Sequence, residues 1–119
     1  MKKNVLYYVD SGNLNPVWNF IQALPTGERN KCFEYIAYLE EMGESVKRPV
    51  GDYLGGKLYE LRPKQIRLFY FFIFKDYAVL VHAFRKKSDQ LPEREIRIAR
   101  QCMEDFIIRH REGNILIGE

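Results

Sequence analysis

The residues of this sequence best suited to chemistry are three cations, a carboxylate and an imidazole within one aromatic-rich stretch. They are Arg62, Arg67, Lys86, Glu60 and His82. Guanidinium and ammonium groups bind phosphate oxygens, and the planar arginine fork contacts two oxygens at once. A carboxylate or an imidazole can accept the proton of an attacking hydroxyl. The set therefore predicts a site for a phosphate ester.

RNA is a phosphate ester that carries its own nucleophile, the 2′-hydroxyl. An enzyme that aligns this hydroxyl with the phosphorus needs cations against the developing charge, a base and an acid. We expect Arg62 and Arg67 to bind the scissile phosphate, and Glu60 or His82 to act as the base. The sequence contains no HExxH, P-loop or GxGxxG motif and no acidic cluster spaced for Mg²⁺. We therefore expect a reaction that uses no metal ion and no other cofactor.

Each candidate also has a structural interpretation. Glu60 can form a cross-strand ion pair with Arg67. His82 lies between apolar neighbours and can be a hydrogen-bonded core residue. Lys86 and Lys87 can protect a strand end against edge-to-edge aggregation. These alternatives stay open from the sequence alone.

The candidates must be positioned by β-strands. Three runs rich in aromatic and β-branched residues, separated by two-residue breaks, predict an antiparallel meander. The runs cover residues 57–62, 65–74 and 77–85. Two-residue turns would fix the register. The predicted pairs are Arg62 with Gln65, Glu60 with Arg67, Phe74 with Tyr77, Ala83 with Leu68 and Lys86 with Gln65.

Because side chains alternate faces along a strand, this register separates two kinds of face. The apolar face contains Tyr59, Leu61, Ile66, Leu68, Tyr70, Phe72, Val79, Val81 and Ala83. The other face contains Leu58, Phe69, Phe71, Leu80 and Phe84 together with Glu60, Arg62, Arg67, His82 and Lys86. The polar candidates thus cluster near one end of the sheet. A three-residue turn at 63–65 would flip the first strand and break the cluster.

The chain before the meander predicts a strand at residues 4–9 and a helical hairpin. Pro16 marks the first turn of one helix, and Gly43 marks the end of the other. Their apolar sides contain Trp18, Ile21 and Leu24 in the first helix and Cys32, Ile36 and Leu39 in the second. Residues 44–56, rich in glycine, proline and charge, predict a loop that leads flexibly into the meander.

After the meander, Pro92 opens a long helix. Its apolar stripe contains Ile96, Ala99, Met103, Phe106 and Ile107, and its outer face contains Arg94, Arg97, Arg100 and Glu104. We expect this helix to cover the apolar part of the charged face and the hairpin to cover the other face. The result is a single α+β domain over residues 1–119 with a four-stranded sheet and a flexible tail at 113–119.

Composition narrows the class of protein. The chain has 119 residues, of which 46% are apolar, and no run approaches the ~20 apolar residues of a membrane span. The apolar run behind the first lysines stops at Asp10, too short for a secretory signal, so we expect a cytoplasmic protein. Cys32 and Cys102 lie far apart without metal-ligand spacing, which predicts reduced thiols.

The charge is unevenly distributed. Residues 57–67 contain four bases and one acid, and residues 85–111 contain eight bases and five acids, whereas residues 28–44 contain two bases and five acids. Such a distribution suits a polyanionic partner, although it is also typical of a solvated surface. We expect further RNA-backbone contacts, besides Lys86, from Lys57, Lys64, Arg85 and Lys87.

The order of motifs resembles a known group of proteins. A helix pair, GGKLYELR, IRLFYFF, VLVHAFRKK and a proline-opened EI-x-x-A helix follow one another between residues 17 and 106. This arrangement resembles the HigB-like, phage-related branch of the RelE/ParE toxin superfamily. The resemblance implies a small toxin that cleaves mRNA on the ribosome without a metal and is neutralised by a helix-turn-helix antitoxin encoded beside it. It gives functional weight to Arg62, Arg67 and the lysines of FRKK.

Two features depart from that pattern. The connection at Pro63 and Lys64 is shorter than the glycine-bearing loop common in such proteins, and Leu91 precedes Pro92 where a small hydroxyl residue is usual. Some ParE-like relatives act on gyrase instead of RNA. The sequence therefore favours an endoribonuclease toxin of a type II pair. The alternatives are a non-enzymatic inhibitor of gyrase or another protein, and an inactive phage-derived binding protein.

Overall fold

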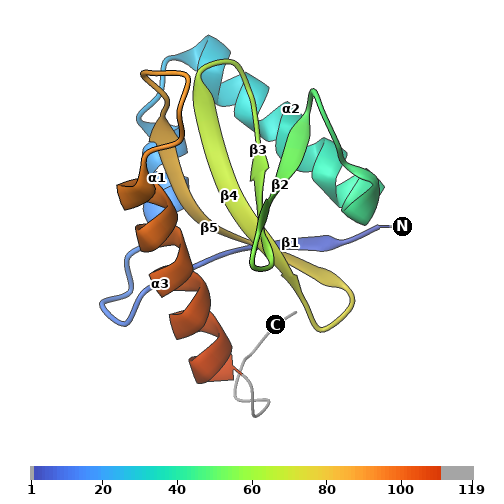
Figure 1. Cartoon of the computed structure of the whole chain (residues 1–119), viewed down its shortest axis with the longest axis vertical. Helices are drawn as coiled ribbons and strands as arrows, with labels where there is room; N and C mark the ends of the chain where they lie inside the picture. The colour runs from blue at the N-terminus through green and yellow to red at the C-terminus, as the bar shows by residue number, and fades with distance from the viewer. Residues whose placement is uncertain (1, 111–119) are drawn as a thin grey trace.

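The computed structural model describes residues 2–110. A five-stranded sheet with strand order β1-β5-β4-β3-β2 lies between helices on both faces (Figure 1). The elements in chain order are β1 (Asn4–Tyr7), α1 (Pro16–Gln22), α2 (Thr26–Met42), the 3₁₀ turn η1 (Gly43–Ser45), β2 (Gly51–Gly55), β3 (Leu58–Leu61), β4 (Ile66–Ile73), β5 (Tyr77–Arg85) and α3 (Glu93–His110). β1 pairs parallel with β5, and the other pairs are antiparallel. The α+β class is confirmed, but the sheet has five strands instead of four.

The additional strand is β2, in the segment predicted as a loop. Glycine and aspartate are poor strand formers, so the local pattern hides this edge strand. Pairing with β3 creates it: a Cβ at Gly51 would lie 2.7 Å from the Glu60 carbonyl oxygen. Gly55 and Gly56, with φ of +97° and +55°, turn the chain into β3. The prediction of a flexible lead is therefore wrong, because these glycines form a hairpin turn.

The register between β3 and β4 differs from the predicted one by two residues. Glu60 lies opposite Phe69 and not opposite Arg67, and Leu61 lies opposite Leu68. The connection is longer than predicted because Arg62 and Gln65 lie outside the strands. A shift of two residues leaves every side chain on its predicted face. Glu60 and Arg67 consequently still share a face of the sheet.

The register between β4 and β5 is confirmed near the basic end and wrong farther along. Leu68 lies opposite Ala83, and the Lys86 N–H donates to the Gln65 carbonyl at 2.7 Å. A bulge after Phe69 then shifts the pairing, so that Tyr77 lies opposite Ile73 instead of Phe74. One unpaired residue reverses the faces that follow it. Val79 and Val81 therefore pack with α3, and Leu80 packs with α1 and α2, opposite to prediction.

The helices cover the sheet as predicted. Buried side chains of α1 and α2 meet one face, and those of α3 meet the other. The confirmed buried positions are Ile21, Leu24, Cys32, Ile36, Leu39, Ala99, Met103 and Phe106, with Ile96 and Ile107 partly buried. Trp18 was expected in the core, but it is 42% exposed because Val17 occupies the inward position of α1.

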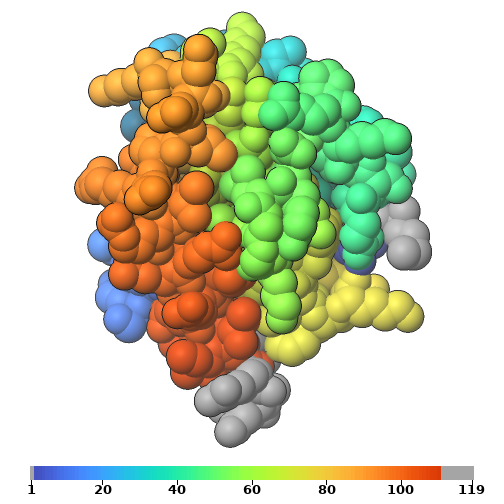
Figure 2. Space-filling model, viewed as in Figure 1, coloured from blue at the N-terminus to red at the C-terminus, as the bar shows by residue number. Residues whose placement is uncertain are grey.

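On the face seen in Figure 2, α3 lies beside the β2–β3 hairpin. Arg100 was predicted to face outward, but its guanidinium donates to the carbonyls of Gly55 and Gly56 at 3.2 and 3.1 Å. Five residues further along the helix, Asp105 accepts a hydrogen bond from the Tyr8 hydroxyl at 2.7 Å. These contacts fix α3 at two points along its length.

Three smaller expectations can be compared with the structure. Cys32 and Cys102 are free thiols, as predicted. No helix among the described residues is long and apolar enough to span a membrane. The predicted tail at 113–119 lies outside the described residues.

A buried lysine ties the start of the chain to η1. The Lys3 ammonium lies 2.8 Å from the Glu44 carboxylate and also donates to the Lys75 carbonyl. The hydrogen bond from Lys3 to the Glu44 carboxylate lowers the pKa of Glu44 below its ordinary value of 4.5. A carboxylate with a lowered pKa stabilises the fold above its unfolded-state pKa, and this contribution disappears as the pH falls through the folded-state value.

We therefore expect Glu44→Gln to lower the free energy of unfolding at pH 7. We also expect the free energy of unfolding of this variant to fall less than that of the wild type between about pH 5 and pH 3. Urea unfolding across this pH range measures both effects. Glu41→Gln is the control, because the Lys2–Glu41 pair is 3.8 Å apart and exposed. A variant at Glu44 with the acid dependence of the wild type would contradict the prediction.

Candidate active site

Three chain connections meet at one end of the sheet, at the top of Figure 1. They precede β2, join β3 to β4, and join β5 to α3. Antiparallel pairing brings them together, since each strand end lies beside the start of the next. Most of the predicted cations lie here. Lys57 is the exception: it follows Gly56 in the β2–β3 turn at the opposite end of the strands.

The centre of this end is a buried group of opposite charges, which we call the Glu60 cluster: Glu60, Arg62 and Arg67. Arg62 Nη1 lies 2.7 Å from Glu60 Oε2, and Arg67 Nε lies 3.8 Å from Glu60 Oε1. Arg67 also donates to the carbonyls of Lys64 and Ile66, both at 2.8 Å. The end of β3, the start of β4 and their connection therefore build the cluster together.

Exposure differs sharply within the cluster. The side chains of Glu60 and Arg67 are 2% and 7% exposed, whereas that of Arg62 is 21% exposed. Glu60 is bonded to Arg62 and shielded from solvent, which favours its interpretation as an ion-pair partner over that of a base. Arg62 is the member that can meet a ligand directly.

The electrostatics favour an anion. Burial lowers the pKa of Arg67, and the positive charges of Arg62 and Arg48 lower it further, partly offset by Glu60. Arg67 Nε and Glu60 Oε1 are buried without a hydrogen-bond partner. Uncompensated buried charge is costly. Two guanidinium groups and one carboxylate leave one positive charge that a phosphate can neutralise.

His82 lies on the same face, one strand farther across the sheet. Its Nε2 is 2.5 Å from Glu95 Oε1 of α3, and its ring stacks on Phe84. Because His82 pairs with Phe69, Arg67 is its diagonal neighbour, with Cα atoms about 7–8 Å apart. A histidine oriented by a carboxylate has the geometry of a general base. The contact with Glu95 also agrees with the alternative interpretation of His82 as a hydrogen-bonded core residue.

The remaining basic candidates divide into two groups. Lys64, Lys86 and Lys87 lie in the connections of the basic end, with Lys86 half-buried and the other two exposed. Arg85 pairs with Ile66 and so points to the face covered by α1 and α2. There it donates to both carboxylate oxygens of Glu28, at 2.7 and 2.6 Å. Arg85 is thus held in an ion pair with α2, away from the Glu60 cluster.

Residues 19–104 match the family described as Phage derived protein Gp49-like (DUF891). The chain belongs to this family. Gp49-like proteins are toxin-like and related to RelE/ParE-type toxins, so the resemblance is confirmed at that level. The matched residues include the whole Glu60 cluster, His82 and Glu95. No curated protein matches the chain.

Two residues of this candidate site were missed from the sequence. Glu95 had no visible link to His82, because it lies on another element. Arg48 lies in the segment predicted as a loop, and its Nε donates to Asp52 at 3.0 Å. The adjacent cations Lys47 and Arg48 were the signal that could have drawn attention to this segment.

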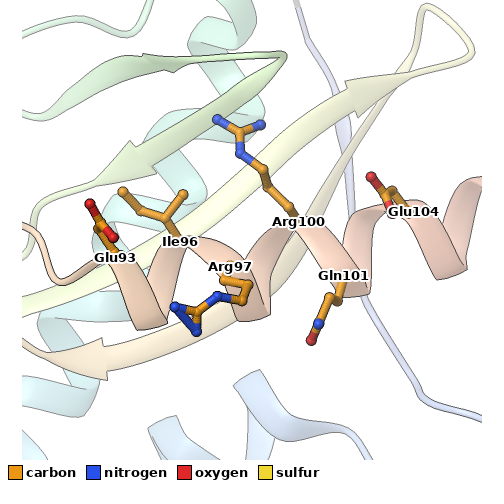
Figure 3. A pocket seen from close by; sticks show the side chains of 6 residues that line it. All are labelled: Glu93, Ile96, Arg97, Arg100, Gln101 and Glu104. Carbon is orange, nitrogen blue, oxygen red and sulfur yellow. The ribbon is translucent and has the colours of Figure 1, made fainter.

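A shallow groove of about 390 Å³ lies along α3 (Figure 3). Its lining consists of Glu93, Ile96, Arg97, Arg100, Gln101 and Glu104. None of the five predicted catalytic residues lines it. Among residues 2–110, no group of three or more His, Cys, Asp or Glu side chains is placed to hold a metal ion.

The burial of the cluster predicts unequal effects on stability. We expect Arg67→Met to lower the free energy of unfolding by about 3 kcal/mol, because it removes one of the two cations beside the buried Glu60 carboxylate and leaves the Lys64 and Ile66 carbonyls without their donor. Arg62→Met should cost about 2 kcal/mol, because it removes the 2.7 Å hydrogen bond to the Glu60 carboxylate but replaces a side chain that is more exposed than Arg67. Urea unfolding gives both values.

Arg94→Met is the control, because Arg94 is 75% exposed on α3. If the loss arises because one cation fewer offsets the Glu60 charge, the double variant Glu60→Gln with Arg67→Met recovers part of it. An Arg67→Met protein as stable as the wild type would show that the cluster does not support the fold.

Proposed function

We propose that this protein is the toxin of a type II toxin–antitoxin pair and that it acts as an endoribonuclease. Membership in a toxin-like family supports the first part. The Glu60 cluster, with its excess positive charge at the basic end of the sheet, carries the second part. A partly exposed arginine held by a buried carboxylate is suited to bind a phosphodiester through two oxygens.

In the proposed reaction, the 2′-hydroxyl of RNA attacks the adjacent phosphorus. The new O2′–P bond forms as the P–O5′ bond breaks, which leaves a 2′,3′-cyclic phosphate and a 5′-hydroxyl. Arg62 donates to the non-bridging oxygens, and the charge of Arg67 behind it stabilises the developing negative charge. Lys64, Lys86 and Lys87 bind phosphates on either side. The base accepts the 2′-hydroxyl proton, and a proton returns to the leaving O5′.

His82 is the better candidate for the base than Glu60. With Glu95 ionised, Nε2–H of His82 donates to it, and Nδ1 is left as an acceptor. The Glu60 carboxylate, by contrast, is bonded to Arg62 and nearly without exposed surface. Because RNA supplies the nucleophile and arginines supply the charge, the proposed reaction needs no metal ion.

The finer assignments rest on the resemblance described above. We propose a HigB-like toxin that acts in the cytoplasm on mRNA, on the ribosome, with a helix-turn-helix antitoxin encoded beside it. The predicted contacts of Lys57 and Arg85 with the RNA backbone have less support than those of the other cations. The first lies at the far end of the strands, and the second is engaged by Glu28.

We expect Arg62→Ala to abolish growth arrest and to lower cleavage at least about 10²-fold, because it removes a charge-stabilising donor. Induced expression followed by mapping of new RNA 5′ ends measures both effects. Arg94→Ala, which removes an exposed arginine from α3, should retain activity.

Three results would contradict this proposal. A folded Arg62→Ala protein that still arrests growth would remove the assigned role of the cluster. Growth arrest with intact RNA and broken DNA would favour gyrase inhibition. A wild-type protein without any effect on growth would favour an inactive phage-derived binding protein.

The proposed role of His82 as the base predicts a different effect on kcat from that on RNA binding. We expect His82→Asn to lower kcat by about 10²–10⁴-fold without changing the Kd for RNA, since a base acts on the transition state and not on binding. Glu95→Gln should lower kcat less, by about tenfold or more, because it only orients the ring. Glu93→Gln is the control, because Glu93 is exposed and lies two residues before Glu95 in the first turn of α3. Unchanged kcat in His82→Asn would exclude His82 as the base.

A further inference from the structure

A second surface adjoins the Glu60 cluster around the edge of the sheet. A groove of about 560 Å³ lies between the end of α2 and the connection that leads to β2. We call it the α2–β2 groove. Tyr38 and Met42 form its helical wall, and Lys47, Arg48 and Val50 form the opposite wall.

The groove is continuous with the basic end. Val50 lines it and also accepts the backbone N–H of Arg62 through its carbonyl at 2.8 Å. The close approach of Gly51 to the Glu60 carbonyl packs this connection against β3. The positive charge of Arg48 also contributes to lowering the pKa of Arg67, as expected for neighbouring cations. A chain bound at Arg62 can therefore pass directly over this connection.

The chemistry of the groove is that of a single-strand binding surface. Arg48 is 64% exposed, and Asp52 engages its Nε. Lys47 is exposed beside it. Tyr38 offers an aromatic ring that is 42% exposed. The acid in the lining, Glu44, is already paired with Lys3 at 2.8 Å. Cations along one wall and an exposed ring on the other match how proteins bind unpaired nucleotides.

We propose that the α2–β2 groove binds single-stranded RNA that flanks the scissile phosphate, which rests on the proposed function. Lys47 and Arg48 bind backbone phosphates, and Tyr38 stacks on an unpaired base. The protein then requires unpaired nucleotides on this side of the cut. Base-paired RNA is excluded from the groove, because its bases cannot reach Tyr38.

Binding of two RNA lengths tests this site. The probes are unstructured 2′-O-methyl RNAs of about four and about twelve nucleotides, which lack the nucleophile and stay intact. Fluorescence anisotropy at several salt concentrations gives the Kd and its salt dependence. The variants are Lys47→Ala with Arg48→Ala, and Tyr38→Ala. The matched controls are Arg94→Ala with Arg97→Ala, and Tyr53→Ala, whose ring is also exposed but does not line the groove.

We expect the Lys47 and Arg48 double variant to weaken binding of the longer RNA about tenfold. The slope of log K against log salt should fall by about 1.4, or about 0.7 for each lost phosphate contact. Tyr38→Ala should weaken it at least about fivefold. The shorter RNA, which occupies only the Glu60 cluster, and both controls should change less than about twofold.

Three outcomes overturn the assignment. The first is unchanged binding of the longer RNA by the groove variants. The second is an equal loss for both RNA lengths. The third is an equal loss in the Arg94 and Arg97 control, which would indicate a general charge effect. If Arg62→Ala loses cleavage and any of these outcomes is also found, RNA binding by the α2–β2 groove is overturned and the proposed endoribonuclease function stands. A wild-type protein that neither binds nor cleaves RNA overturns the proposed function as well.

Discussion

The basic end of this protein depends on one buried carboxylate. Glu60 lies at the centre of the sheet end with 1% of its surface exposed, between the guanidinium groups of Arg62 and Arg67. Two such cations repel each other unless an anion lies between them. A buried carboxylate, in turn, needs cations to offset the loss of its hydration. The three side chains therefore require one another, and the remaining positive charge meets solvent at Arg62.

The rest of the structure keeps this cluster in place from both faces of the sheet. On one face, the two hydrogen bonds between Arg85 and Glu28 fix the end of β5 to the first turn of α2. On the other, Arg100 fixes α3 to the β2–β3 turn, and Glu95 fixes it to His82. Glu60, Arg67 and His82 lie on strands, and functional groups held on strands and supported by such contacts keep a more exact geometry than groups on loops. The site is thus positioned by the sheet and its two helical layers together.

The arrangement also fits the size of the proposed substrate. An RNA chain is long and charged, so it is bound over a surface and not enclosed in a cavity. Apart from Arg67 on β4, the cations assigned to RNA lie in three separate connections that meet only in the folded sheet. The Gp49-like family is related to the RelE/ParE toxins, and the proposed function places RNA binding on this surface.

The sequence by itself determined the helix boundaries, four of the five strands and the grouping of Glu60, Arg62, Arg67 and His82 on one face. Helix ends follow from local caps such as Asn15 and Gly43. The shared face survived a wrong register, because strand alternation has a period of two and the error was two residues. The edge strand β2, the bulge in β5 and the partners Glu95, Glu28 and Arg48 were decided only by the tertiary structure. Each depends on contacts between segments distant in the chain, whereas a local pattern encodes only periodicity and the places where the chain turns.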